Sequence, residues 1–428
     1  MAAKKEKVKK EKDKKANRKK HLKRLAVVLA IVVLFFVVTA IISVVGNNAN
    51  IKKAQSFEKV QIENQLVPEK DADGNWTFTT DRDFKVMQLT DIHLGGGWIS
   101  LKKDAMAINA VAAMVTAEKP DLVVITGDIA FPLPYASGTL NNLAPAKLFA
   151  ALMENLGVYW TVTFGNHDTE SFSYYNREKV SDFYENSGFK YCLYQAGPDN
   201  IDGYGNHVIN VKNTAGEITQ SLFMFDSHSY TDDDPLGIRW NYDNIQPSQI
   251  EWYKNTLAKL NEQNNAVLAA NGKEPVDTIK SLAFFHIPLT ETKTAWYEYA
   301  DNGYKDTENA KLVYGVAGET GEIVYSPVGE DNLFETMVEL GSTKAVFFGH
   351  DHLNNFALNY KGIQLTYGYS VDYLAYWQIS KKGAQRGCTI IETKPDGSFE
   401  SRLENFYQDK YVTLYEKEQV TMQEVVYE

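Results

Sequence analysis

Cysteine is scarce in this 428-residue sequence, which contains only Cys192 and Cys388. Neither belongs to a Cys-x-x-Cys spacing, so a metal site built on that motif is excluded. The two residues either form one disulfide or remain buried thiols, because sequence separation does not fix their distance in space. Internal repeats are also lacking, which argues against an array of stacked repeat units.

A net excess of positive charge is found in the first 24 residues, which hold 13 Lys or Arg against three acids and carry +10. The whole chain has a net charge of −11, so the remainder carries −21. An acidic body of this kind argues against tracking a polyanion through a basic surface, and no nucleic-acid binding is expected. A phosphate substrate remains compatible, since two divalent cations can dominate the local field of a pocket.

One uncharged apolar run of 21 residues follows the basic arm, from Leu25 to Val45. About 20 apolar residues cross a bilayer as a helix, whereas the apolar part of a signal peptide has about 7 to 15. We therefore predict a transmembrane signal anchor at 25–45, single-pass, in the cell membrane. Basic residues stay cytoplasmic, so residues 1–24 form a cytoplasmic arm and the body is extracytoplasmic. A cleaved signal peptide is the alternative, because Ala40, Ser43 and Gly46 supply small residues near its end.

The remaining chain divides into a polar spacer at 46–83 and one large domain at 84–428. Strand-like and helix-like segments alternate in the domain, which predicts βαβ units and an α/β fold. Expected strands include 84–89, 122–126, 159–164, 207–211, 221–225, 281–285 and 345–348, with a closing hairpin at 387–406. Expected helices cover 102–118, 146–156 and 247–264. Residues 290–329 lack clear periodicity and are expected to form a long surface excursion beside the site.

Polar blocks follow five of the predicted strands. They are Asp91-Ile92-His93, Gly127-Asp128, Gly165-Asn166-His167-Asp168, His286, and Gly349-His350-Asp351-His352. Asp, Asn and His supply the mixed oxygen and nitrogen ligands that suit Mn, Fe, Zn or Co. Side chains at the carboxyl ends of strands converge on one edge of a sheet. Each block alone is a weak signal, but together they predict a site for two divalent metal ions whose identity stays open.

The order of these blocks, from Phe84 to Phe356, resembles the calcineurin-like metallophosphoesterase family. The resemblance implies a layered β-sandwich flanked by helices. It also implies one metal held by Asp91, His93, Asp128 and His352, and a second held by Asp128, Asn166, His286 and His350. Asp128 would bridge the two metals. A hydroxide activated between them would attack the phosphorus in line, and His167 would be the catalytic residue that protonates or stabilises the leaving oxygen.

The sequence departs from two branches of that family at Phe131, three residues after Asp128. Purple acid phosphatases place a metal-binding Tyr there and protein Ser/Thr phosphatases an Asp. A coloured Fe(III) centre is therefore not expected, and the acid that orients His167 must be Asp168 or a distant carboxylate. Asp226 and His228 are further candidates for supporting the ligands, although a surface role is the commoner fate of such a His. Aromatic residues that could line a pocket, or simply pack in the core, are Trp240, Tyr242, Trp252, Tyr297 and Tyr367.

The predicted function is a membrane-anchored, exterior-facing phosphoesterase that hydrolyses phosphate mono- or diesters with two divalent metals. Its partners would be a phosphate-ester substrate and the membrane, and the oligomeric state stays open. The alternative is a non-catalytic, metal-containing binding module of the same fold at the cell surface. The complete set of ligand-type residues favours the enzyme, because a scaffold gains nothing from unpaired Asp and His side chains at strand ends.

Overall fold

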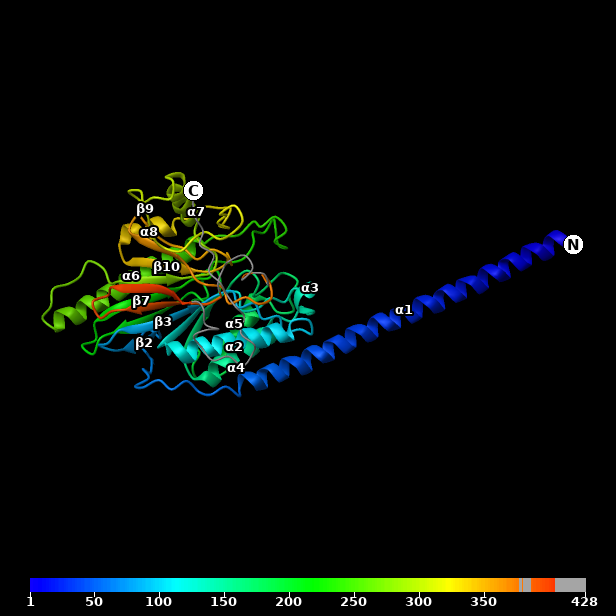
Figure 1. Ribbon diagram of the computed structural model, residues 1–428, viewed down its shortest axis with the longest axis horizontal. Helices are drawn as coiled ribbons and strands as arrows, with labels where there is room; N and C mark the ends of the chain where they lie inside the picture. The colour runs from blue at the N-terminus through cyan, green and yellow to red at the C-terminus, as the bar shows by residue number, and fades with distance from the viewer. Residues whose placement is uncertain (377–378, 380–385, 405–428) are drawn as a thin grey trace.

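The body of the protein is a sandwich of two β-sheets covered on both outer sides by helices (Figure 1). The computed structural model describes residues 1–376, 379 and 386–404. One apolar core lies between the sheets and beneath α2 and α4, and a second lies between the larger sheet and helices α6, α7 and α8. The predicted layered α/β fold with flanking helices is thereby confirmed. The end of the expected domain, 405–428, lies outside the described residues.

The smaller sheet has the strand order β14-β13-β3-β4-β5. Its parallel strands are β3 (Phe84–Leu89), β4 (Leu122–Thr126) and β5 (Tyr159–Thr163), with Met87 opposite Val123 and Val123 opposite Trp160. The crossovers contain α2 (Leu101–Glu118) and α4 (Leu143–Leu156), and the antiparallel strands β13 (Cys388–Thr393) and β14 (Phe399–Glu404) close the edge. Every residue of β4 and β5 is buried, as expected of parallel strands covered on both faces.

The larger sheet has nine strands in the order β1-β2-β6-β7-β8-β10-β12-β11-β9. Its strands are β1 (Glu69–Lys70), β2 (Trp76–Thr79), β6 (His207–Lys212), β7 (Ile218–Met224), β8 (Ser281–Phe284), β9 (Ala310–Tyr314), β10 (Thr343–Phe348), β11 (Ala357–Tyr360) and β12 (Ile363–Tyr367). Helices α6 (Pro247–Ala270), α7 (Thr290–Asp301) and α8 (Leu333–Leu340) cover its outer face. Strands β7, β8 and β10 are parallel, so their carboxyl ends lie at one edge.

Two segments differ from the sequence-based expectation. The region 290–329 is not a structureless excursion, because it contains α7 and β9. Buried Trp296 and Tyr299 tie α7 to the second core and so stabilise a helix whose Thr-rich start has low intrinsic propensity. The expected spacer 46–83 also contributes to the fold, since residues 46–54 continue α1 and β2 pairs with β6.

The first helix, α1 (Ala2–Ala54), runs without interruption from the basic arm through the apolar run to the body (Figure 1). Its last part packs against α2 and α4. Its apolar side chains from Leu25 onward are mostly exposed. Within the described residues, α1 is the helix that is long and apolar enough to cross a membrane, and a signal sequence would pass the same test.

The two cysteines lie on different elements and do not pair with each other. Cys192 is a free thiol in the segment beside β5, and Cys388 is buried in β13. Burial raises the pKa of the Cys192 thiol well above its ordinary value, so this side chain is a weak nucleophile. The disulfide left open by the sequence is thus absent from the fold.

Candidate metal centre

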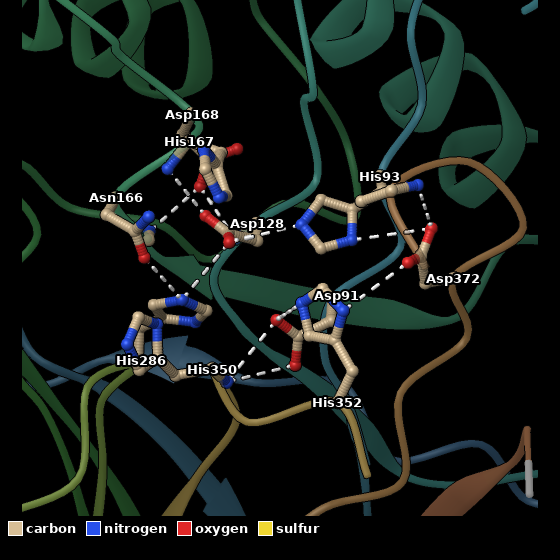
Figure 2. A network of polar contacts seen from close by, with 12 residues as sticks. Asp91, His93, Asp128, Asn166, His167, Asp168, His286, His350, His352 and Asp372 are labelled. Atoms are coloured by element: carbon tan, nitrogen blue, oxygen red, sulfur yellow. Dashed lines mark hydrogen bonds and ion pairs between the residues drawn. The ribbon is translucent and has the colours of Figure 1, made fainter. Parts of the chain in front are cut away.

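All seven predicted ligands and His167 meet at the carboxyl ends of five parallel strands from both sheets (Figure 2). Asp91 and His93 follow β3, Asp128 follows β4, and Asn166 and His167 follow β5. His286 follows β8, and His350 and His352 follow β10. Asp91, His93, Asp128, Asn166 and His286 are almost fully buried. The sandwich therefore assembles at one edge the side chains that are dispersed over 262 positions of the chain.

Asp128 is the central carboxylate of the cluster. Its Oδ2 lies 3.2 Å from Nε2 of His93 and 3.2 Å from Nε2 of His286, which come from different sheets. Its Oδ1 accepts a hydrogen bond of 2.8 Å from the backbone N–H of His167. A carboxylate between two imidazoles in this way has the position that a bridging ligand requires.

Asp91 anchors the other end of the cluster. Its Oδ1 lies 3.5 Å from Nε2 of His352, and its Oδ2 accepts hydrogen bonds from the backbone N–H of His350 (3.1 Å) and from Oγ1 of Thr90 (2.9 Å). These contacts tie the loop after β3 to the loop after β10. The tie brings residues 259 positions apart in the sequence into one site.

The donor atoms fit divalent metals. Three groups of side chains each place their ligand atoms within 4.8 Å of one another, namely Asp91, His93 and His352; His93, Asp128 and His167; and Asp91, Asp128 and His286. Nε2 of His350 is buried and has no hydrogen-bond partner among the described residues. An unsatisfied buried nitrogen is costly unless it binds something, so its position beside this cluster indicates a ligand atom.

Charge within the cluster is balanced between carboxylates and imidazoles. Burial alone would raise the pKa of Asp128, but facing His286 and His167 hold it well below the usual range. Burial would lower the pKa of His286, and Asp128 instead raises it to about 9. A ligating imidazole must be neutral, so binding of a cation would release protons from these residues.

Four of the clustered residues have a left-handed backbone. Asp91, His93, Asp128 and His350 have φ values of 50°, 51°, 55° and 77°, a region that non-glycine residues rarely adopt. Such conformations cost roughly 1 to 3 kcal/mol each and concentrate at functional sites. The fold therefore holds these residues in a backbone conformation that they would not prefer locally. This left-handed conformation could not be predicted from the sequence.

The glycines that precede the polar blocks allow the strand ends to approach one another. A Cβ at Gly349 would lie 1.8 Å from Oγ1 of Thr90 and 2.5 Å from Oδ2 of Asp91. A Cβ at Gly165 would lie 2.1 Å from Oδ1 of Asp128. Both positions therefore exclude any side chain, because real Cβ atoms do not approach other atoms so closely.

Glu170 is the acid that orients His167. Its Oε1 lies 2.6 Å from Nδ1 of His167, and its side chain is almost fully buried. Asp168, the nearer candidate in the sequence, does not contact the imidazole. Its carboxylate accepts 2.9 Å hydrogen bonds from the backbone N–H groups of Asp128, Ala130 and Gly165, and thus fixes the loops after β4 and β5.

Asp372, which the sequence analysis did not single out, lies behind two of the histidines (Figure 2). Its Oδ1 is 3.6 Å from Nδ1 of His93, and its Oδ2 is 3.5 Å from Nδ1 of His352. Burial would raise its pKa, but the charges of His93 and His352 lower it. The carboxylate therefore holds both rings with Nε2 directed into the cluster. It follows β12 in a segment without a recognisable motif, so only its position in space identifies it.

Asp226 and His228 lie outside the cluster. Asp226 pairs with Arg177, whose Nη2 donates to the carbonyl oxygen of Gly165 at 2.9 Å. Nε2 of His228 lies 2.8 Å from Oε1 of Gln249 on α6. Asp226 thus supports the loop after β5 through Arg177. The His228 side chain instead contacts Gln249, which is not one of the proposed metal ligands.

Aromatic rings enclose the polar cluster. Phe131 packs edge-on against His93 and His167, with ring centroids 5.0 and 4.8 Å apart. Tyr242 packs edge-on against His350 at 4.3 Å, and the hydroxyl of Tyr230 accepts a 3.0 Å hydrogen bond from Nδ2 of Asn166. Of the other aromatic candidates, Tyr367 is fully buried and bonds to Asp351, Trp252 packs on the second core, and Trp240 and Tyr297 are exposed.

Comparison with known proteins gives this arrangement a context. The model of the calcineurin-like phosphoesterase family matches residues 84–354. A curated relative from Arabidopsis thaliana, probable inactive purple acid phosphatase 28, is 27% identical over 344 residues, covering 74% of this chain and 77% of the relative. Probable inactive purple acid phosphatase 14 of the same plant is 29% identical, again with 74% and 77% covered.

Two further similarities involve proteins named as phosphatases. Phosphatase DCR2 of Saccharomyces cerevisiae is 29% identical over 299 residues, covering 65% of this chain and 46% of the yeast protein. The solved structure of a dimetal phosphatase from Danio rerio aligns with a TM-score of 0.48 at 12% identity, covering 76% of this chain and 97% of that one.

Proposed function

The chain belongs to the calcineurin-like phosphoesterase family, and we propose that it hydrolyses phosphate mono- or diesters with two divalent cations. We also propose that it is anchored in a membrane by α1. The observation that carries the proposal is the contact between His167 and Glu170 beside the Asp128 cluster. A cluster with only structural metals has no need of an oriented imidazole at its edge.

In this proposal the seven ligand side chains divide into two sets that share Asp128. Asp91, His93, Asp128 and His352 hold one cation, and Asp128, Asn166, His286 and His350 hold the other. The division is supported by Asp372, which contacts His93 and His352 from one set and no ligand of the other. When bound, the two cations supply an activated water near neutral pH and compensate charge on the phosphate.

Side chains of the protein position the ester and donate a proton to its leaving oxygen. Glu170 accepts from Nδ1–H of His167 and fixes the direction of the ring. The other ring nitrogen, Nε2, then carries the proton that passes to the leaving oxygen. Phe131 packs against this imidazole and excludes water from one side of it. A leaving group that departs as a neutral alcohol is better than an alkoxide, so this proton transfer lowers the barrier.

A non-catalytic binding module is the competing function. The names of two Arabidopsis relatives contain the word inactive, which makes this alternative concrete. In the present chain every proposed ligand position and the His167–Glu170 pair are filled with suitable side chains. We therefore favour the enzyme.

The anchor is part of the same proposal. Helix α1 carries 13 basic residues before its apolar run, and Lys and Arg are retained on the cytoplasmic side of membranes. We propose that residues 25–45 span the cell membrane and that the metal centre lies on the extracytoplasmic side. The test introduces Gly188→Cys and treats intact cells with a membrane-impermeant thiol reagent. We expect the new cysteine to be labelled. Protection at this exposed position would contradict the orientation.

The test of activity uses the full chain in detergent with a chromogenic phosphomonoester and a chromogenic phosphodiester, each with Mn, Fe, Zn or Co. His167→Ala is expected to lower kcat by about 100-fold or more while bound metal is retained. Asp128→Asn is expected to lose both activity and metal. Glu178→Gln, on the exposed face of α5 (Arg177–Asn186), is the matched control. Two bound metals without hydrolysis of either ester in the wild type would favour the binding module.

A further inference from the structure

We propose that the edge of the body that holds the metal centre rests on the membrane that α1 crosses, and that the substrate is a phosphate ester carried by a lipid. This inference rests on the proposed function and specifies its substrate class. It is carried by the direction of the strands relative to α1, by a contact between the site loop and the apolar run, and by exposed apolar side chains around the site.

The strands point their carboxyl ends toward the part of α1 that leaves the body. Nδ2 of Asn50 on α1 donates to the carbonyl oxygen of Leu101 at the start of α2. Past the end of α1, Phe57 and Val60 contact Asn155 and Leu156 at the end of α4. Helices α2 and α4 therefore begin near the departing part of α1, and α4 runs in the same direction as α1.

Crossover helices run antiparallel to the strands they connect, so β3, β4 and β5 run back toward the apolar run of α1. The candidate ligands follow the carboxyl ends of these strands. In Figure 1, α1 accordingly leaves the body on the right, the side on which α3 (Pro134–Ser137) lies. The metal centre thus faces the membrane side of the body when α1 spans a bilayer.

The loop that follows His93 contacts the apolar run directly. The backbone N–H of Trp98 donates to Oγ of Ser43 at 2.9 Å, and the Trp98 indole packs edge-on against Phe35 with centroids 6.1 Å apart. The buried carboxylate of Asp104 accepts from the N–H groups of Gly95 and Gly96 at 2.8 and 3.0 Å. Trp98 lies five positions after His93, so a short fixed loop joins the proposed ligand to the anchor.

The depth of this contact matches that of an interfacial anchor. At 1.5 Å per residue, Ser43 and Phe35 lie roughly 3 and 15 Å below Val45, the end of the apolar run. The indole of Trp98 lies between these levels. Monotopic anchors bury their apolar side chains about 5 to 10 Å into the boundary between headgroups and acyl chains, and Trp is enriched there.

Exposed apolar side chains flank the metal centre on this edge. We define them as the apolar rim: Trp98, Ile99, Tyr135, Tyr174, Ile238 and Trp240. Tyr135, Ile238 and Trp240 are 78%, 76% and 60% exposed, which is unusual for such large side chains in water. Ile238 and Trp240 belong to the loop between Tyr230 and Tyr242, the two tyrosines that contact Asn166 and His350.

A bilayer explains these three features together. Trp240 of the rim lies in a loop whose tyrosines contact proposed ligands, the loop after His93 touches the anchor, and the strand ends face the membrane. A phosphate in a lipid headgroup would therefore lie at the level of the metal centre without leaving the membrane. The site and such a substrate would lie at the same membrane surface, so the protein would not have to extract the lipid.

The test uses the full chain reconstituted in phosphatidylcholine vesicles. Phosphatidic acid and phosphatidylglycerol in the vesicles are compared with their soluble headgroup counterparts, glycerol 3-phosphate and glycerophosphoglycerol, and with the chromogenic esters. One lipid ester is expected to be hydrolysed at least about tenfold faster than its soluble counterpart. Substitution of both Ile238→Ser and Trp240→Ser should lower the lipid rate by about tenfold or more, because the variant loses the apolar area that these two side chains bury in the membrane. Hydrolysis of the chromogenic ester should be unchanged in that variant.

A second readout does not depend on turnover. Lipids brominated along the acyl chain should quench wild-type tryptophan fluorescence more strongly than that of Trp240→Phe. The double change Val313→Ser and Val328→Ser, at exposed positions outside the rim, is the matched control for loss of apolar surface and should leave both readouts unchanged.

The outcomes separate this inference from the function on which it rests. If the chromogenic or soluble esters are hydrolysed and neither lipid ester is preferred, the lipid inference is overturned and the phosphoesterase function stands. If no ester is hydrolysed, the proposed function fails and the substrate inference fails with it. If the rim substitutions abolish self-association in nanodiscs and leave lipid hydrolysis unchanged, a second copy of the chain covers the rim and the inference is overturned.

Discussion

Oε1 of Glu170 lies 2.6 Å from Nδ1 of His167, three residues earlier in the chain. In the proposed mechanism the pair lies at the edge of the metal centre from which a departing alcohol would receive its proton. Phe131 leaves no acid at the position from which the protein Ser/Thr phosphatases supply theirs, and Glu170 fills that need from the same loop as His167 itself. The spacing is short enough that the two side chains move together with the loop after β5.

We expect Glu170→Gln to lower kcat by roughly tenfold to 100-fold while two metals remain bound. The amide can still accept from Nδ1–H but no longer carries the charge that stabilises a protonated ring. The measurement is kcat against pH beside metal content. An unchanged kcat and pH profile in Glu170→Gln, with His167→Ala inactive, would mean that Glu170 has only a structural role.

Asp372→Asn should weaken one metal site and leave the other intact. Asp372 contacts Nδ1 of His93 and His352, which we assign to the same cation, and loss of such a partner typically costs 10-fold to 100-fold in metal affinity. Titration of the metal-free protein should show one weakened site of two, and high metal concentration should restore the rate. Equal weakening of both sites would contradict the division of the ligands.

Asp128→Asn and Asp91→Asn should differ in the number of metals lost. Asp128 lies between His93 and His286, whereas Asp91 contacts His350 and His352 at one end. We expect neither cation to bind well to Asp128→Asn and one cation to remain in Asp91→Asn, as measured by metal analysis after dialysis. Retention of two metals in Asp128→Asn would exclude its role as the shared ligand.

Acid should destabilise the body through His207. Burial lowers the pKa of this residue to about 4 from 6.5, and the neutral ring suits its contacts with Oγ1 of Thr161 and the carbonyl oxygen of Gly205, both at 2.8 Å. A depressed pKa contributes stability that is present above pH 6.5 and lost as the pH falls through 4. The full contribution is on the order of 3 kcal/mol.

The check compares the free energy of unfolding at pH 7.5 and pH 4.5, in chelator so that metal binding does not enter. His207→Gln should lose less stability between the two pH values than the wild type, because glutamine has no charge to gain. His21→Gln, in the basic arm, is the control. Equal losses in wild type and His207→Gln would rule out this origin of acid sensitivity.

The strands that position the site were predictable because they are buried on both faces. The runs Phe84–Leu89 and Leu122–Thr126 are mostly apolar segments that end shortly before polar blocks, and the structure has these bounds. The convergence of the ligands followed from the parallel arrangement. In contrast, residues 46–83 were expected to be a polar spacer, whereas α1 continues to Ala54 and its last part packs against α2 and α4.

The supporting acids could not be found in the same way. Asp372 is 279 residues beyond His93, and no periodicity or motif links the two. Glu170 is near His167, but the choice between Asp168 and Glu170 depends on how the loop turns. Asp168 points back to the N–H groups of three loop residues, whereas Glu170 points to the imidazole. Loop geometry of this kind is set by the whole fold.

The uninterrupted course of α1 has a kinetic meaning for an anchored enzyme. Under the proposed anchoring, the packing of the end of α1 against α2 and α4 would keep the catalytic edge at a constant height above the membrane. The frequency of encounters with a lipid ester would then depend on the number of substrate molecules per unit area of membrane. Lateral diffusion of enzyme and lipid would set this frequency. The relevant variable for such a protein is the mole fraction of substrate in the leaflet, and dilution of the aqueous phase would leave its rate unaltered.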